Sequence, residues 1–280
     1  MNVGQQTPKA TTLGALGLHL MPLVSGQDER RPSVLASLDD HGRLERLERF
    51  GSNEQIAKAV GDGPALVCVD QPLVVLNMQG QRMFEHLLSW CDAPTLPISI
   101  TRSGTLYGGL RGLDIAALLS GLPLTLAESL PDLTLRHLMW EHENPLQIDL
   151  EAYRARWLGL RVPSYRPKGT GRARPSGLAP ASEIVSRAVD LNGWAPPGTP
   201  DDWEAIAAAA ELDAIVCAYA AWRALHTDGG HRTLRFADGA FAVLATGPNL
   251  AERLEIHAER LGGIIVSTLP PAGGTPHIPT

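Results

Sequence analysis

The sequence predicts an α/β fold with a mixed β-sheet and helices on both of its faces. Strand-like apolar stretches alternate with helix-like patterns along most of the 280 residues. A continuous apolar run at 65–69 is typical of a central strand that is buried on both faces. Hydrophobic residues make up 44% of the chain, so a large core can form without disulfides.

The first half of the chain predicts four strands. The turn at 39–42 lies between the second and the third strand and is typical of a hairpin. A capping box at 52–55 begins a helix that ends near Val60. The pattern of the third strand fits a helix equally well. The predicted strands are Leu13–Met21, Ser33–Leu38, Arg43–Phe50 and Ala65–Val69.

The second half continues with helices and strands, and a segment at 161–180 with several Pro and Gly residues predicts a loop. Thr199 as the cap and Pro200 at the first position begin a long helix that reaches about Leu225. The other predicted helices are Gln79–Trp90, Leu110–Leu119, Pro131–Trp140 and Asn249–Leu261. The predicted strands are Leu122–Ala127, the hairpin pair Thr233–Phe236 and Ala240–Thr246, and Ile264–Leu269.

The order of these elements predicts the kind of α/β fold. A three-stranded meander extended by parallel crossovers is the topology of the RNase H-like (RuvC-like) fold. We therefore expect this fold, with a mixed five-stranded sheet, helices on both faces and a C-terminal hairpin/helix extension. Residues 12–269 are expected to form a single domain with insertions, and residues 1–11 and 270–280 to be flexible tails.

Cysteine content and net charge indicate the cellular compartment and the kinds of partner that this protein can have. The three cysteines lie far apart without CxxC spacing, which argues against a disulfide framework and fits a reducing compartment. The N-terminus lacks the features of a signal peptide, and no apolar run approaches the roughly 18 residues of a membrane span. We expect a cytoplasmic protein with no membrane partner. The net charge of −6 argues against sequence-blind coating of nucleic acid, and the oligomeric state stays open.

Three acidic residues stand out by position. Asp70 and Glu128 lie where buried strands end, at the edge where ligands of open α/β sheets collect. Asp213 lies on an apolar stripe of the long helix, where a lone carboxylate is costly unless a cation offsets it. Together they predict a site for Mg²⁺ or Mn²⁺, and two such ions about 4 Å apart can catalyse an in-line phosphodiester displacement. Alternatively, Asp70 only caps the helix that follows it.

One segment of this acidic chain is strongly basic. From Arg154 to Arg174 there are seven basic residues and no acid. Such a segment can bind a phosphate backbone, which makes nucleic acid a candidate partner. The alternative is a solvated loop in an arginine-rich chain.

Five short segments also carry a resemblance to a known family. They are VCVDQPL at 67–73, AESLP at 127–131, the basic loop at 168–174, LDAIVCAY at 212–219 and DGAFAV at 238–243. In these segments, and in their order, the chain resembles domain-of-unknown-function family 429, whose members are described as predicted nucleases with an RNase H-like fold. The resemblance covers about residues 12 to 248.

The resemblance implies roles for particular residues. The active-site acids and metal ligands would be Asp70, Glu128 and Asp213, and the contacts to substrate phosphate would be Lys168 with Arg172 or Arg174. Such proteins place an aspartate in the first strand as Gly-x-Asp, whereas this chain has His19 two residues after Gly17. A ring nitrogen of His19 can bind a metal, although imidazole suits Mg²⁺ poorly.

Two functions are therefore expected from the sequence. The first is a metal-dependent nuclease that hydrolyses phosphodiester bonds by a two-metal mechanism. The alternative is a catalytically degenerate RNase H-like module that binds nucleic acid or a protein partner, as His19 and the acidic net charge suggest. A phosphotransferase of the actin-like ATPase fold is less favoured, because the chain has no glycine-rich phosphate turn near its start.

Overall fold

The computed structural model describes residues 13–21, 32–61, 63–93, 95, 97–107, 110–143, 148–166, 175–227, 230–237 and 239–267. The strands in this part are β1 (Gly14–His19), β2 (Ser33–Leu38), β3 (Leu44–Phe50), β4 (Ala65–Val69), β5 (Leu124–Glu128), β6 (His231–Phe236), β7 (Phe241–Ala245) and β8 (Ile264–Ser267). The α-helices are α1 (Asn53–Val60), α2 (Met83–Trp90), α3 (Ile100–Tyr107), α4 (Arg111–Leu119), α5 (Pro131–Glu143), α6 (Leu150–Gly159), α7 (Leu178–Ser186), α8 (Asp202–His226) and α9 (Pro248–Leu261). A short 3-10 helix covers Pro175–Gly177.

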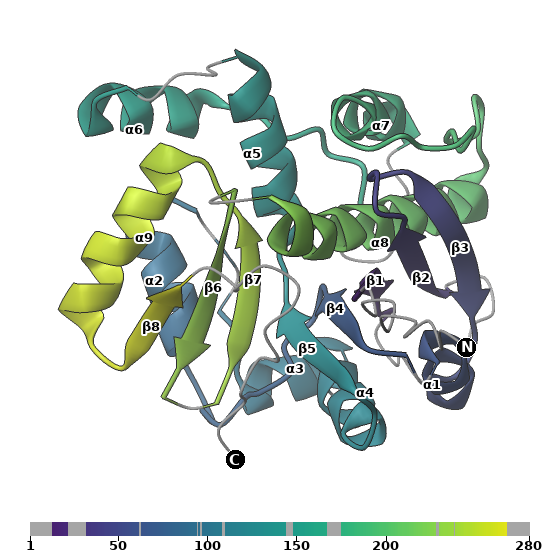
Figure 1. The fold of residues 1–280 in the computed structure, drawn as a ribbon, viewed down its shortest axis with the longest axis horizontal. Helices are drawn as coiled ribbons and strands as arrows, with labels where there is room; N and C mark the ends of the chain where they lie inside the picture. Colours follow the sequence, from purple (N-terminus) through teal and green to yellow (C-terminus); the bar gives the residue numbers. More distant parts are fainter. Residues whose placement is uncertain are drawn as a thin grey trace, which may run out of the picture.

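The strands of the described residues form one mixed sheet of eight, in the order β3-β2-β1-β4-β5-β7-β6-β8 (Figure 1). Strands β1 to β3 are an antiparallel meander, and β4 and β5 extend it in parallel. A single parallel bridge, Glu128 with Ala242, joins β5 to β7. The predicted mixed α/β sheet is confirmed. The predicted number of five strands is wrong, because the C-terminal hairpin of β6 and β7, together with β8, joins the same sheet instead of forming a separate extension.

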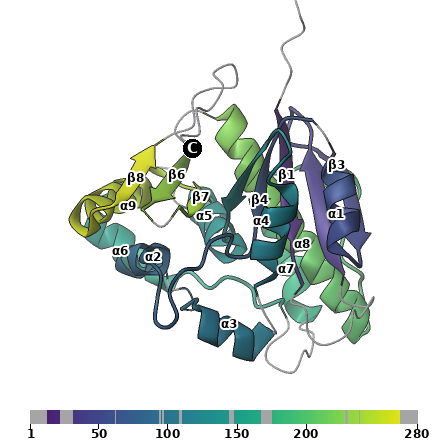
Figure 2. The same cartoon turned by 90° about the horizontal axis from the view of Figure 1, so that it is seen from below.

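Helices cover both faces of the sheet, as predicted. On one face, Leu18 of β1 and Val67 of β4 pack against α1 and α4. On the other face, Ala15 of β1 and Cys68 of β4 pack against Cys217 of α8. Figure 2 shows the sheet between these two layers. Successive residues of a strand point to opposite faces, so an uninterrupted apolar run such as β4 fits this sandwich.

Helix α8 is the central helix of the fold. By length and composition it could cross a membrane, but 89% of its apolar window is buried inside the protein, so the core uses that apolar surface. The helix begins two residues later than predicted. Asp201 is the N-cap in place of Thr199, because its side chain accepts hydrogen bonds from the N–H groups of Trp203 and Glu204, and Glu204 completes a capping box.

Several predicted elements are confirmed, and three helices are new. The bounds of β2 and β4 are those predicted, and the capping box of α1 forms between Ser52 and Gln55. Helices α3, α6 and α7 were not predicted, and α7 begins inside the predicted 161–180 loop. The basic residues Lys168, Arg172 and Arg174 lie outside the described residues.

Candidate metal site

Two of the candidate ligands come from neighbouring parallel strands. His19 is the last residue of β1, and Asp70 directly follows β4. These strands pair in register up to Leu18 with Val69. The N–H of Asp70 extends the ladder by donating to the Leu18 carbonyl at 3.1 Å. His19 and Asp70 therefore leave the sheet side by side, at the edge where ligands of open α/β sheets collect.

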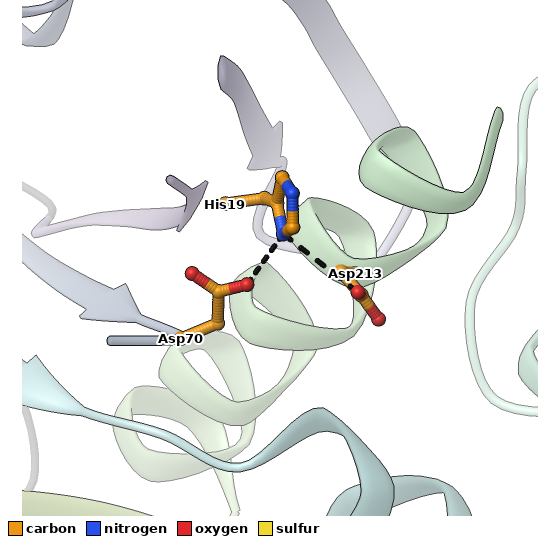
Figure 3. A group of neighbouring side chains, drawn as sticks. All are labelled: His19, Asp70 and Asp213. Carbon is orange, nitrogen blue, oxygen red and sulfur yellow. Dashed lines mark hydrogen bonds and ion pairs between the residues drawn. The ribbon is translucent and has the colours of Figure 1, made fainter. Parts of the chain in front are cut away.

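The third candidate comes from the middle of α8. Asp213 is only 2% exposed, which confirms the prediction that it faces the interior. The helix crosses β1 very closely, because a Cβ at Gly17 would lie 2.7 Å from the carbonyl carbon of Cys217 and even nearer to backbone atoms of Ala214 and Ala218. This close crossing places Asp213 beside the end of β1, where it meets His19 (Figure 3).

His19 lies between the two carboxylates. Its Nδ1 hydrogen-bonds Oδ2 of Asp70 and lies 3.7 Å from Oδ2 of Asp213. Its other ring nitrogen, Nε2, is 3.1 Å from the sulfur of Met21. Burial lowers the pKa of His19, but the attraction of Asp70 and Asp213 outweighs burial and raises it above its usual value. One ligand atom from each of the three residues lies within 4.8 Å of the others.

Asp213 also has partners that the sequence did not predict. The Tyr165 hydroxyl donates to Oδ1 at 2.5 Å. Arg166 donates from Nε to Oδ2 at 2.6 Å and from Nη2 to Oδ1 at 2.5 Å, and it also pairs with Asp132. Arg166 belongs to the basic segment that the sequence indicated. Nothing local in that segment shows that this arginine, rather than its neighbours, faces Asp213.

Glu128 does not join this group of three. Its side chain is buried and accepts two hydrogen bonds from Arg82, both at 2.8 Å, and one from the N–H of Leu73 at 2.9 Å. Burial raises the pKa of Glu128, and the guanidinium of Arg82 opposes that shift. Arg82 also binds Glu85, so one buried cation serves two carboxylates. Arg82 was not among the predicted site residues, and a basic residue 46 positions away gives no local signal of this pairing.

The chain matches no family model, and it matches no curated protein and no solved structure. What can be inferred about function therefore depends on the chemistry of the side chains themselves.

The three side chains fit a divalent ion in number and type. In spacing, Nδ1 of His19 and Oδ2 of Asp70 are directly hydrogen-bonded and must move apart to admit an ion. Ligands bonded to one ion at about 2.1 Å lie roughly 3–4 Å apart, and His19 Nδ1 and Asp213 Oδ2 already have that spacing. With Nε2 of His19 held against the Met21 sulfur, Nδ1 is the nitrogen that faces the carboxylates. One nitrogen and two carboxylates favour Mn²⁺ or another transition metal over Mg²⁺.

Proposed function

We propose that this chain is an RNase H-like, metal-dependent hydrolase of phosphodiester bonds in nucleic acid. The observation that carries the proposal is the convergence of His19, Asp70 and Asp213 at the carboxyl edge of two parallel strands. The strand order β3-β2-β1-β4-β5 also supports it, since a meander extended by parallel strands is the RNase H-like arrangement.

The proposed site holds one ion. A divalent ion in such a site supplies Lewis-acid chemistry for phosphodiester hydrolysis. His19, Asp70 and Asp213 would be its ligands. The N–H of Leu20 donates to Oδ1 of Asp70 at 3.0 Å and so fixes the direction of that carboxylate. Because Glu128 is committed to Arg82, we propose a single-ion centre instead of the two-ion centre that the sequence suggested.

Isothermal calorimetry with Mn²⁺ tests this site. We expect the wild type to bind one ion per chain, and Asp70→Asn and Asp213→Asn each to weaken binding by about 10- to 100-fold. Glu211→Gln is the matched control, because Glu211 lies on the same helix but pairs with Arg49. A folded wild type that binds no Mn²⁺ at millimolar concentration would refute the metal site.

Cleavage assays then test the reaction. The wild type is incubated with single- and double-stranded DNA and RNA in Mn²⁺. We expect cleavage that Asp70→Asn abolishes and Glu211→Gln retains. Urea denaturation of both variants shows whether they are folded. Metal binding without cleavage of any of these substrates would refute the nuclease activity while leaving the metal site in place.

A second candidate function is a non-catalytic binding module. The observation that favours it is that the charged groups of the site already pair with one another, His19 with Asp70 and Arg166 with Asp213. A closed network of this kind can be purely structural. In that case the folded wild type binds no Mn²⁺, whereas the proposed enzyme binds it. Asp70→Asn removes the partner of His19 in both cases, so Mn²⁺ binding and not stability separates the two functions.

A further inference from the structure

Arg166 stands between the candidate metal site and the surface. Its side chain is 29% exposed, whereas that of Asp213 beneath it is 2% exposed. The guanidinium binds both oxygens of Asp213. On its outer side it pairs with Asp132, whose side chain is 71% exposed. Arg166 therefore has one partner inside the site and one at the rim.

The contacts of Arg166 compete with a metal ion for Asp213. A carboxylate oxygen has two acceptor positions, and Oδ1 already accepts from both Tyr165 and Arg166. Oδ2 accepts from Nε of Arg166 and keeps one position, and it lies 3.7 Å from Nδ1 of His19. A divalent ion bound there would lie close to the guanidinium, and two cations at that separation repel each other strongly in a buried site.

We infer that Arg166 is the counter-ion of Asp213 in the metal-free protein and the ligand for substrate phosphate in the metal-bound one, an inference that rests on the proposed function. The charges of the site support this exchange. A divalent ion balances the two carboxylates of Asp70 and Asp213, and Arg166 then keeps only Asp132, whose side chain is 71% exposed and therefore screened by water. The donors of Arg166 that leave Asp213 can then bind a phosphodiester, which carries one negative charge.

Two residues, Tyr165 and Asp132, hold Arg166 near the site during such an exchange. Its Nη2 donates to the Tyr165 hydroxyl at 2.9 Å, and its guanidinium carbon lies 4.9 Å from the centre of the Tyr165 ring. Asp132, at the start of α5, binds Nη1 at the rim. The planar fork of an arginine can pass from a carboxylate to a phosphate, because both accept two parallel hydrogen bonds.

The test compares Arg166→Gln with the wild type in two titrations. In Mn²⁺ calorimetry we expect the variant to bind the ion about tenfold more tightly, because the competing cation is gone. With Mn²⁺ present, we expect it to bind the dinucleoside monophosphate TpT about tenfold more weakly. Arg49→Gln is the control, since Arg49 pairs with Glu211 of the same helix outside the site, and it should change neither affinity.

The outcomes separate this inference from the proposed function. If the wild type binds Mn²⁺ and Arg166→Gln binds it equally well or more weakly, the exchange is refuted but the metal site remains. Unchanged TpT affinity overturns the role in phosphate binding. No Mn²⁺ binding by the folded wild type or the folded variant overturns the metal site and this inference together. If Arg166→Gln does not fold, Arg166→Lys replaces it in the TpT titration only, because lysine keeps the competing charge but loses the two-point contact, and TpT should still bind more weakly.

Discussion

Gly17 is the position where a single added methyl group should disrupt both the fold and the candidate site. In Gly17→Ala the new Cβ would lie 2.7 Å from the carbonyl carbon of Cys217 and closer still to backbone atoms of Ala214 and Ala218. Ordinary van der Waals contact begins at 3.4 Å. The atoms that this Cβ meets are all backbone, and the Cβ itself is fixed to the backbone of β1. Neither side can rotate away, so α8 and β1 must separate by roughly 1 Å.

The expected cost follows from that separation. Overpacking a filled core costs about 1–3 kcal/mol, and we expect about 3 kcal/mol here because a whole helix must shift. The same shift moves Asp213 away from His19, so Mn²⁺ affinity should fall by about 10- to 100-fold. Urea denaturation measures the first effect, and calorimetry on the folded variant measures the second.

Gly14→Ala is the matched control on the same strand. A Cβ at Gly14 would lie 3.6 Å from the Cβ of Ala65, which is an ordinary contact, so stability should change by no more than about 0.5 kcal/mol. The reasoning is refuted if Gly17→Ala is as stable as Gly14→Ala and binds Mn²⁺ like the wild type.

Two further predictions concern ion pairs away from the site. Arg82→Met leaves Glu128 buried without its cation. Thermal or urea denaturation should therefore show that the free energy of unfolding falls by about 3–5 kcal/mol. A variant whose stability lies within about 1 kcal/mol of the wild type would contradict the pairing. Burial raises the pKa of Glu141, but His137 and Arg223 outweigh it and lower that pKa to about 2. The stabilisation from Glu141 is therefore complete above its usual pKa of 4.5 and is lost as the pH falls towards 2. In urea denaturation, the difference in stability between the wild type and Glu141→Gln should therefore shrink as the pH falls through this range. A difference that does not change with pH would contradict the predicted role of Glu141.

Local signals in the sequence predicted much of the fold. The bounds of β2 and β4 follow from apolar runs that end at turn residues, and α1 follows from a capping box. The interior position of Asp213 follows from its apolar neighbours at helical spacing. Each of these signals lies within a few residues of the feature that it predicts.

Contacts between distant segments could not be predicted in the same way. The attachment of the C-terminal hairpin to the sheet depends on one bridge between Glu128 and Ala242. The pairing of Glu128 with Arg82 spans 46 residues, and that of Asp213 with Arg166 spans 47. Because many arginines could meet each acid, charge and spacing alone do not select the partner. The sequence therefore identified His19, Asp70 and Asp213 as candidates but not Arg166, the cation that binds Asp213.

The buried thiols of Cys68 in β4 and Cys217 in α8 can be used to measure how often α8 separates from the sheet. Both thiols are fully buried where α8 meets the sheet, and burial raises the pKa of each thiol above its usual value. An alkylating reagent can reach them only when that interface separates, so their labelling rate measures how often α8 leaves β4. Cys91 is equally buried in a different cluster and provides an internal reference. If Mn²⁺ slows the labelling of Cys217 but not that of Cys91, a ligand at the sheet edge stabilises the packing of α8 on the sheet.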